Sequence, residues 1–218
     1  MAQDGEVSII VKIKEFGRDS LNKIADTLDD VKVKAGLVSA ALTGFIAASV
    51  NAYRESEEAT NSLRTALINQ GLDVGTLSKK YTELASAIQK KTLFQDDEVT
   101  GAIAIAQSLA GNIALTEEMI KATVDFAAAN KIDLFSAFQI VGKSIGTNTN
   151  ALGRYGVELD ENASKSNKME VITKSLSKSF DGAAASQAKG LGSLKQLKNA
   201  FGELLEIIGK QFAPFISK

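Results

Sequence analysis

Apolar residues between positions 21 and 45 recur at alternating intervals of three and four. On a helix, this spacing places all of them on one narrow stripe, which no polar residue interrupts. The stripe consists of Leu21, Ile24, Leu28, Val31, Ala35, Val38, Leu42 and Phe45. Such regularity is typical of a seam between helices. We therefore predict a long helix from about Leu21 to about Asn69. We favour self-association through its seam over packing within one chain.

Residues 6–14 follow a different pattern, in which apolar and polar side chains alternate. Val7, Ile9, Val11 and Ile13 fall on one face, a period of two that predicts a short strand. A single strand is unstable by itself. We therefore expect this strand to pair with another chain or to dock on another element.

Residues 35–53 carry no charge, which raises the question of a membrane span. Most of the segment is Ala, Ser, Gly and Thr, and its strongly apolar side chains are few. A buried contact between helices is therefore favoured over a stable transmembrane helix. A membrane-active, pore-forming or channel-forming protein that uses this segment is the alternative function.

The middle of the chain, from Thr76 to about Ser179, has the apolar spacing of several shorter amphipathic helices. Thr76 and Thr116 are candidate N-caps, and Gly111 and Gly146 mark helix ends. The expected core positions are Leu84, Ile88, Leu93, Ile103, Ala106, Leu109, Ile120, Val124, Ala127, Leu134, Phe138, Val141 and Ile145. Residues 148–168 have no long period and predict a loop with one short turn. The group as a whole predicts a small helical domain.

A second heptad pattern lies near the end of the chain. This C-terminal seam consists of Leu194, Leu197, Phe201, Leu204 and Ile208. It follows a run of small residues, 181–185, which predicts a hinge, and Pro214 is expected to end the helix. The predicted organisation is a strand and long heptad helix in 1–69, a helical domain in 70–180, and a hinge with a terminal amphipathic helix in 181–218.

Composition supports an all-α fold and excludes several functions. Aromatic residues make up only 6% of the chain and there is one proline, which favours close-packed helices. The 25 basic and 26 acidic residues give a net charge of −1, which argues against specific binding of nucleic acid. The chain has no His, Cys or Trp, so the commonest catalytic and metal-binding side chains are missing.

Two local patterns invite a chemical interpretation. Gly142-Lys143-Ser144 matches the end of a phosphate-binding loop, but Ala137 stands where the motif needs a glycine, and the preceding residues predict a helix. The acidic clusters 29–30, 96–98 and 160–161 lack the alternating ligands of a calcium loop. We therefore expect no enzymatic activity, no catalytic residue, no cofactor and no metal site.

From Asp133 onward the chain contains a series of motifs in a characteristic order. They are Asp133-Leu134, Gly142-Lys143-Ser144-Ile145, Gly146-Thr147-Asn148-Thr149 and Leu152-Gly153-Arg154-Tyr155-Gly156-Val157, followed by FDGAAASQA and LKNAFGEL. In this order and spacing they resemble the tail tape measure proteins of tailed bacteriophages. The resemblance covers roughly residues 50–214.

The resemblance implies a structural role in the virion. Members of this family lie as a few helical copies in the lumen of the tail tube, template its length and leave when DNA is ejected. It implies assembly in the host cytoplasm and contacts with tail tube proteins, the baseplate hub and tail assembly chaperones. For this chain we favour a homotrimer formed through the 21–45 seam, with the host membrane as a further contact of 35–53 on ejection. A fully helical chain of this length spans only about 330 Å. A short tail, a fragment of a longer protein and a component of a phage-derived injection machine therefore all stay open.

Overall fold

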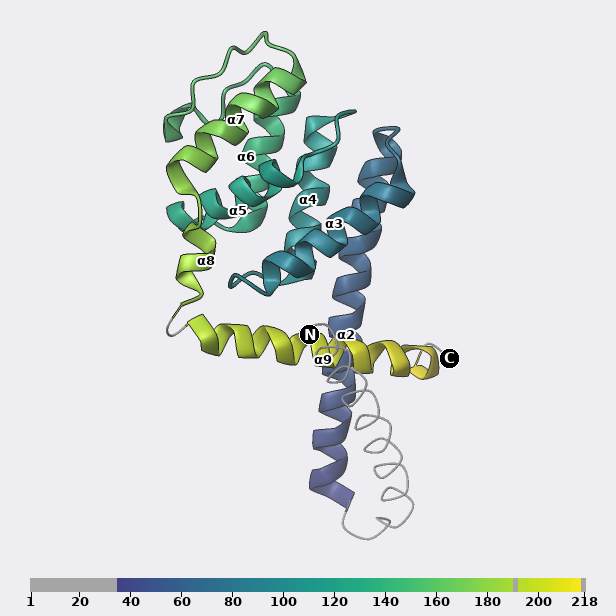
Figure 1. The fold of residues 1–218 in the computed structure, drawn as a ribbon. Coiled ribbons are helices and arrows are strands. Elements are labelled where there is room, and N and C mark those ends of the chain that lie inside the picture. The colour runs from purple at the N-terminus through teal and green to yellow at the C-terminus, as the bar shows by residue number, and fades with distance from the viewer. Residues whose placement is uncertain (1–34, 190–191, 217–218) are drawn as a thin grey trace, which may run out of the picture. The chain divides into compact units, whose positions relative to one another are not determined.

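The structure, a computed structural model, describes residues 35–189 and 192–216 (Figure 1). All regular elements within these residues are helices, which confirms the prediction of an all-α fold. The strand predicted at 6–14 and the seam positions Leu21, Ile24, Leu28 and Val31 lie outside the described residues.

The chain divides into two compact units, Met1–Ala47 and Ala48–Lys218. Helix α2 (Ala35–Asn69) contributes residues to both of them. It ends at Asn69, as the sequence predicts, and Gly71 follows with a φ of 66°. This left-handed conformation is the one in which glycine commonly ends a helix.

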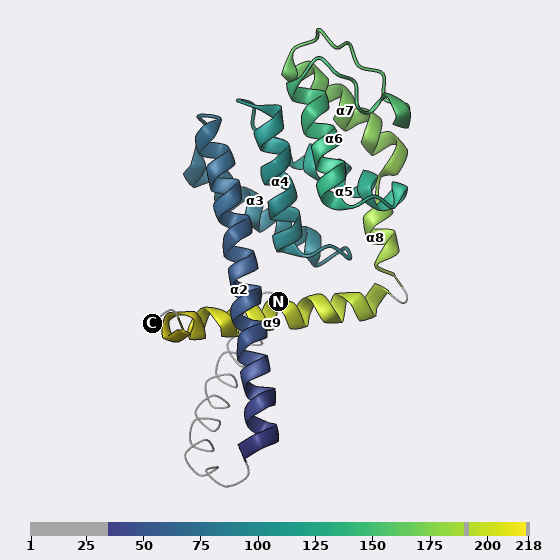
Figure 2. The same cartoon turned by 180° about the vertical axis from the view of Figure 1, so that it is seen from behind.

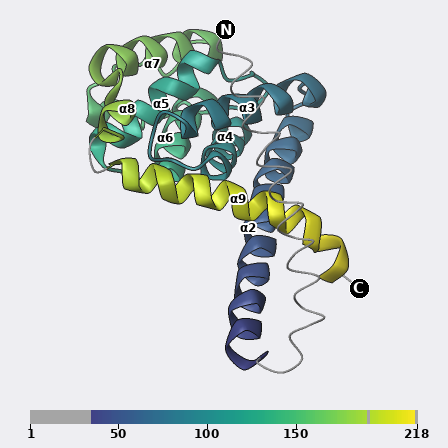
Figure 3. The ribbon, with the colours of Figure 1, turned by 60° about the horizontal axis from the view of Figure 1, so that its bottom comes forward.

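In the second unit, the end of α2 and the shorter helices after it pack around one core, and a longer last helix follows (Figures 1 and 2). After the end of α2 the elements are α3 (Val74–Gln89), α4 (Asp96–Ala110), α5 (Glu117–Asn130), α6 (Leu134–Gly146), the 3-10 turn η1 (Gly153–Tyr155), α7 (Lys165–Phe180), α8 (Ala183–Gln187) and α9 (Gly192–Ile216). Helix α4 packs along α6, and α5 packs along α7. Helix α8 lies against α5 (Figure 3).

The core contains most of the positions expected from apolar spacing. Eleven of them are buried: Leu84, Ile88, Ile103, Ala106, Ile120, Val124, Ala127, Leu134, Phe138, Val141 and Ile145. Leu93 and Leu109 are only half-buried. The last turns of α2 add Leu63 and Leu67, both fully buried. The C-terminal part of the long helix is therefore an integral part of the helical domain.

Helix starts were predicted with mixed success. Thr116 caps α5 as expected, since its hydroxyl accepts a hydrogen bond from the Met119 N–H at 3.2 Å. The prediction for Thr76 is wrong: the N-cap of α3 is Asp73, whose carboxylate accepts from the Thr76 N–H at 3.1 Å. An aspartate three residues earlier has a charged acceptor in the right place, so the helix begins one turn sooner.

Of two predictions for the C-terminal region, the hinge at 181–185 stays a prediction and the end of the last helix is wrong. Within 181–185, α8 begins at Ala183 after Gly182, which has a φ of 74°. The carboxylate of Asp125 accepts from the N–H groups of Gly182 and Ala184 and thereby caps α8. Pro214 does not end α9, which continues to Ile216. Near a helix end the missing proline N–H removes one hydrogen bond, and the backbone keeps its helical course.

Helices α4 and α6 approach each other closely at two glycines. A Cβ atom on Gly142 would lie 2.8 Å from both the Cα and the O of Ala106, and one on Gly146 would lie 1.8 Å from the O of Leu109. Both distances are far below van der Waals contact. The hydrogen atom of glycine is therefore what allows the two backbones to pack at this separation.

Candidate functional site

The two predicted seams are described in part. Ala35, Val38 and Leu42 lie in α2, and Phe45, the last position of the N-terminal seam, is 38% exposed. In the C-terminal seam, Leu194 and Leu197 lie within α9, Phe201 and Leu204 are exposed, and Ile208 is half-buried. Phe201, Leu204 and Ile207, which is also exposed, leave apolar surface on α9. Association through either seam stays a prediction.

Helix α9 contacts the rest of the second unit through small and polar residues. A Cβ on Gly209 would lie 1.8 Å from the O of Ser49 and 3.0 Å from the Cβ of Tyr53, so α9 crosses the backbone of α2 at this glycine. Asn199 is buried, and its amide donates to the O of Leu93 at 3.4 Å. Sequence reasoning missed this contact. The available signal was a Gly and an Asn inside an otherwise apolar amphipathic pattern.

Four carboxylates gather where α9 meets the start of α4. They belong to Asp96, Asp97, Glu203 and Glu206. Burial raises the pKa of Asp97, which the charge of Asp96 raises further. Burial likewise raises the pKa of Glu203 and of Glu206, again with a repulsive contribution from Asp96. Lys90 partly offsets the effect at Glu203, and a hydrogen bond with Ser56 does so at Glu206.

Because these pKa values are raised in the folded chain, acid should strengthen the packing of α9. The folded state binds protons more tightly than a state with α9 released. This gain in the stability of the folded state is therefore fully present below the ordinary pKa of a carboxyl group. It is lost as the pH rises through the raised pKa values of the folded chain. We expect the variant with Glu203→Gln and Glu206→Gln to be more stable than the parent at pH 7. The difference should stay below about 1 kcal/mol because both side chains are partly solvated.

Urea unfolding at pH 7 and at pH 4.5 measures this difference. The free energy of unfolding of the double glutamine variant should exceed that of the parent by less at pH 4.5, because the parent glutamates take up protons there. Glu158→Gln, at an exposed position of the loop after η1, is the matched control and should leave the free energy of unfolding unchanged. A double variant that is less stable than the parent at pH 7 would contradict the assignment.

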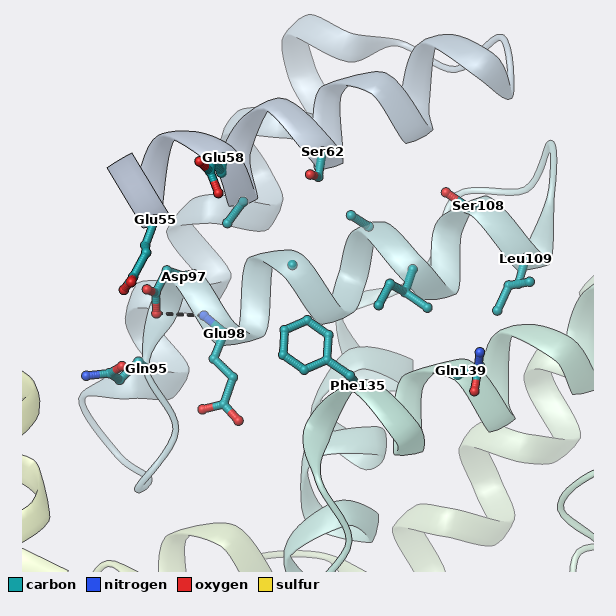
Figure 4. Close-up of a pocket in the computed structure, with 14 residues that line it drawn as sticks. Glu55, Glu58, Ser62, Gln95, Asp97, Glu98, Ser108, Leu109, Phe135 and Gln139 are labelled. Carbon is teal, nitrogen blue, oxygen red and sulfur yellow. Dashed lines mark hydrogen bonds between the residues drawn. The ribbon is translucent and has the colours of Figure 1, made fainter. Parts of the chain in front are cut away.

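A groove lies between α4, α6 and the part of α2 that belongs to the second unit (Figure 4). It has a volume of about 750 Å³. Helix α4 lines it from Asp97 to Leu109, and the walls come from α2 and α6. Its lining residues are Glu55, Glu58, Ala59, Ser62, Gln95, Asp97, Glu98, Gly101, Ala104, Ile105, Ser108, Leu109, Phe135 and Gln139. Sequence reasoning did not find this groove, because its walls come from segments far apart in the chain.

Of the patterns with candidate chemistry, the acidic cluster 29–30 lies outside the described residues, whereas two others lie in helices. Gly142-Lys143-Ser144 lies inside α6, with Lys143 in the last turn, and so does not form a phosphate-binding loop. Asp96, Asp97 and Glu98 occupy the first turn of α4, where negative charge is favourable. Within residues 35–189 and 192–216, no group of three or more acidic side chains is arranged to hold a metal ion.

The uncharged segment 35–53 forms the first half of α2. None of the described helices combines the length and the apolar character that a bilayer span requires.

Comparison of the chain with known protein families, with curated proteins and with solved structures gives no match.

Proposed function

We propose that the chain is a tail tape measure protein, or part of one, which lies in the lumen of a phage tail tube and templates its length. The observation that carries the proposal is the run of motifs from Asp133 to Val157, which keeps the order and spacing found in that family. The family role that follows is structural, and it needs no catalytic residue.

The side chains of these motifs have identifiable structural tasks. Asp133 caps α6 by accepting from the Ser136 N–H at 2.8 Å. Leu152 and Val157 are buried on either side of η1, and Gly156 has a φ of 79°. The ring of Tyr155 meets Phe126 edge-on, with 4.7 Å between the ring centroids. The motif residues thus cap, turn and pack the helical domain, which is consistent with a structural role.

Helix α2 supports the part of the proposal that concerns length. It has 35 residues, which at 1.5 Å per residue correspond to about 52 Å of helix. We propose that the seam from Leu21 to Phe45 joins three copies of the chain and that tail tube and hub proteins contact the assembled helices. Tail assembly chaperones would cover them before assembly. A net charge of −1 suits a protein that gives way to DNA, because it holds neither phosphate nor counterions strongly.

The decisive experiment changes the length of the heptad helix. Inserting three heptads, or deleting one, in register within residues 21–45, ahead of the buried residues of α2, should keep the seam and leave the helical domain intact. Particles assembled with these variants should have tails lengthened by about 30 Å or shortened by about 10 Å, which are the lengths of 21 and 7 helical residues. Tail length is measured by electron microscopy.

The matched control carries a flexible insertion of the same size between Asn148 and Thr149, two exposed residues of the loop after α6. Its tails should keep the parent length, because this loop adds nothing along a helix. Intact tails of unchanged length in the heptad variants would reject the ruler. Vesicle leakage caused by the purified chain would instead favour a membrane-active role.

A further inference from the structure

The floor of the groove between α2, α4 and α6 consists of apolar residues. Gly101 and Ala104 put no bulky side chain on the floor. The Phe135 side chain (Figure 4), 42% exposed, lies against Gly101, where a Cβ atom would be 3.2 Å from its ring. Ile105 and Leu109 are half-buried and extend the apolar strip along α4. A partner that covered this strip would gain about 25 cal/mol for each Å² of apolar surface removed from water.

The acidic side chains of the groove lie at one of its ends. Glu55, Glu58, Asp97 and Glu98 lie toward one end, whereas the other end has the neutral side chains of Ser108 and Gln139 (Figure 4). None of the lining residues is a Lys or Arg. Arg54 lies beside this end, with its Nε 3.6 Å from the Glu58 carboxylate. Glu55, Glu58 and Arg54 together carry a net charge of −1, so this end of the groove is negative.

The length of the groove fits a short helix. The lining part of α4 runs from Asp97 to Leu109, a rise of about 18 Å along the helix axis. A partner helix of about three turns spans that distance. Its apolar face, with side chains three and four residues apart, would match a floor built from residues at the same spacing.

We propose that this groove binds a short amphipathic helix of another protein that is apolar on one face and carries Lys or Arg at one end. Phe135 is the apolar anchor, and Glu55 and Glu58 select the basic end. The proposal does not depend on the tape measure assignment, because it uses only the shape, exposure and charge of the groove.

The test uses the full chain and a synthetic helical peptide of about 14 residues, with leucines on one face and lysines at one end. Binding is followed by fluorescence anisotropy. The lysine peptide should bind, and a peptide with glutamates in place of the lysines should bind at least tenfold more weakly. Raising the salt concentration should reduce the difference in affinity between the two peptides, because the carboxylates of the groove are partly exposed to solvent.

Variants of the chain locate the binding site. Phe135→Ala should weaken binding of the lysine peptide at least tenfold, whereas Val171→Ala, which truncates an exposed apolar side chain on α7, should not. The pair Glu55→Lys and Glu58→Lys should also weaken binding at least tenfold. The control pair Glu118→Lys and Glu158→Lys changes the net charge equally at exposed positions outside the groove and should have little effect. Circular dichroism confirms that each variant is folded.

Three results would overturn the proposal. Equal affinity for the lysine and glutamate peptides would show that charge does not select the partner. Equal weakening by both pairs of lysine substitutions would show a general electrostatic attraction without a site. Concentration-dependent self-association of the parent chain, abolished by Phe135→Ala in analytical ultracentrifugation, would identify a second copy as the occupant.

Discussion

Replacing Gly146 by alanine is expected to destabilise the helical domain by about 2 kcal/mol. The new Cβ would lie 1.8 Å from the O of Leu109 and 2.8 Å from its carbonyl carbon. These are backbone atoms of α4, so no side chain can rotate away, and the two helices must separate. Overpacking of this kind costs typically 1–3 kcal/mol. Alanine returns at most about 1 kcal/mol through its helix propensity. Urea unfolding followed by circular dichroism measures the net loss.

The matched control is Gly75→Ala in α3. The nearest atom to a Cβ at that position is the Asp73 Oδ1 at 3.5 Å, which is ordinary van der Waals contact. This variant should be as stable as the parent or more stable by up to about 1 kcal/mol, because it gains helix propensity without a clash. Equal stability of Gly146→Ala and Gly75→Ala would mean that the close approach of α4 and α6 is not required for the fold.

Local patterns were the part of the fold that the sequence predicted well. The spacing of Ile120, Val124 and Ala127 identified the buried face of α5, and Thr116 identified its start. Both depend only on residues within a few turns of each other, which a helix brings together whatever the rest of the chain does. The same locality made the phosphate-loop interpretation of Gly142-Lys143-Ser144 easy to reject.

Features that depend on distant residues were not predictable. Gly146 was interpreted as a helix end, and it is one, but its contact with Leu109 depends on how two helices pack. The 181–185 segment was predicted to be a hinge because its residues are small. Its helical form depends on Asp125, more than fifty residues away in sequence. The groove was not predictable for the same reason, because Glu55 and Phe135 on its walls come from distant segments of the chain.

Replacing Gln107 by leucine is expected to cost about 2–4 kcal/mol. This side chain is fully buried, and its amide donates to the carbonyl oxygens of Gly111 at 2.9 Å and Ile113 at 2.8 Å. Its own oxygen accepts from the Leu115 N–H at 3.3 Å. One side chain thus satisfies three backbone groups of the connection between α4 and α5. Leucine fills a similar volume but removes all three hydrogen bonds. The Gly111 O keeps the Ile113 N–H as a donor at 2.9 Å, whereas the Ile113 O and the Leu115 N–H lose this partner, and each unpaired buried group costs about 1–3 kcal/mol.

The expected loss is measured as the shift of the urea midpoint, with Gln139→Leu as the control. Gln139 is exposed on α6, so its replacement should change the free energy of unfolding by less than about 0.5 kcal/mol. Gln107→Glu separates hydrogen bonding from packing, because the shape is kept while the ionised carboxylate can only accept. It should be strongly destabilised at pH 7 and recover as the pH falls, when the protonated carboxyl can donate to one of the two carbonyls. A loss in Gln107→Glu that does not depend on pH would place the origin of the stability in packing instead.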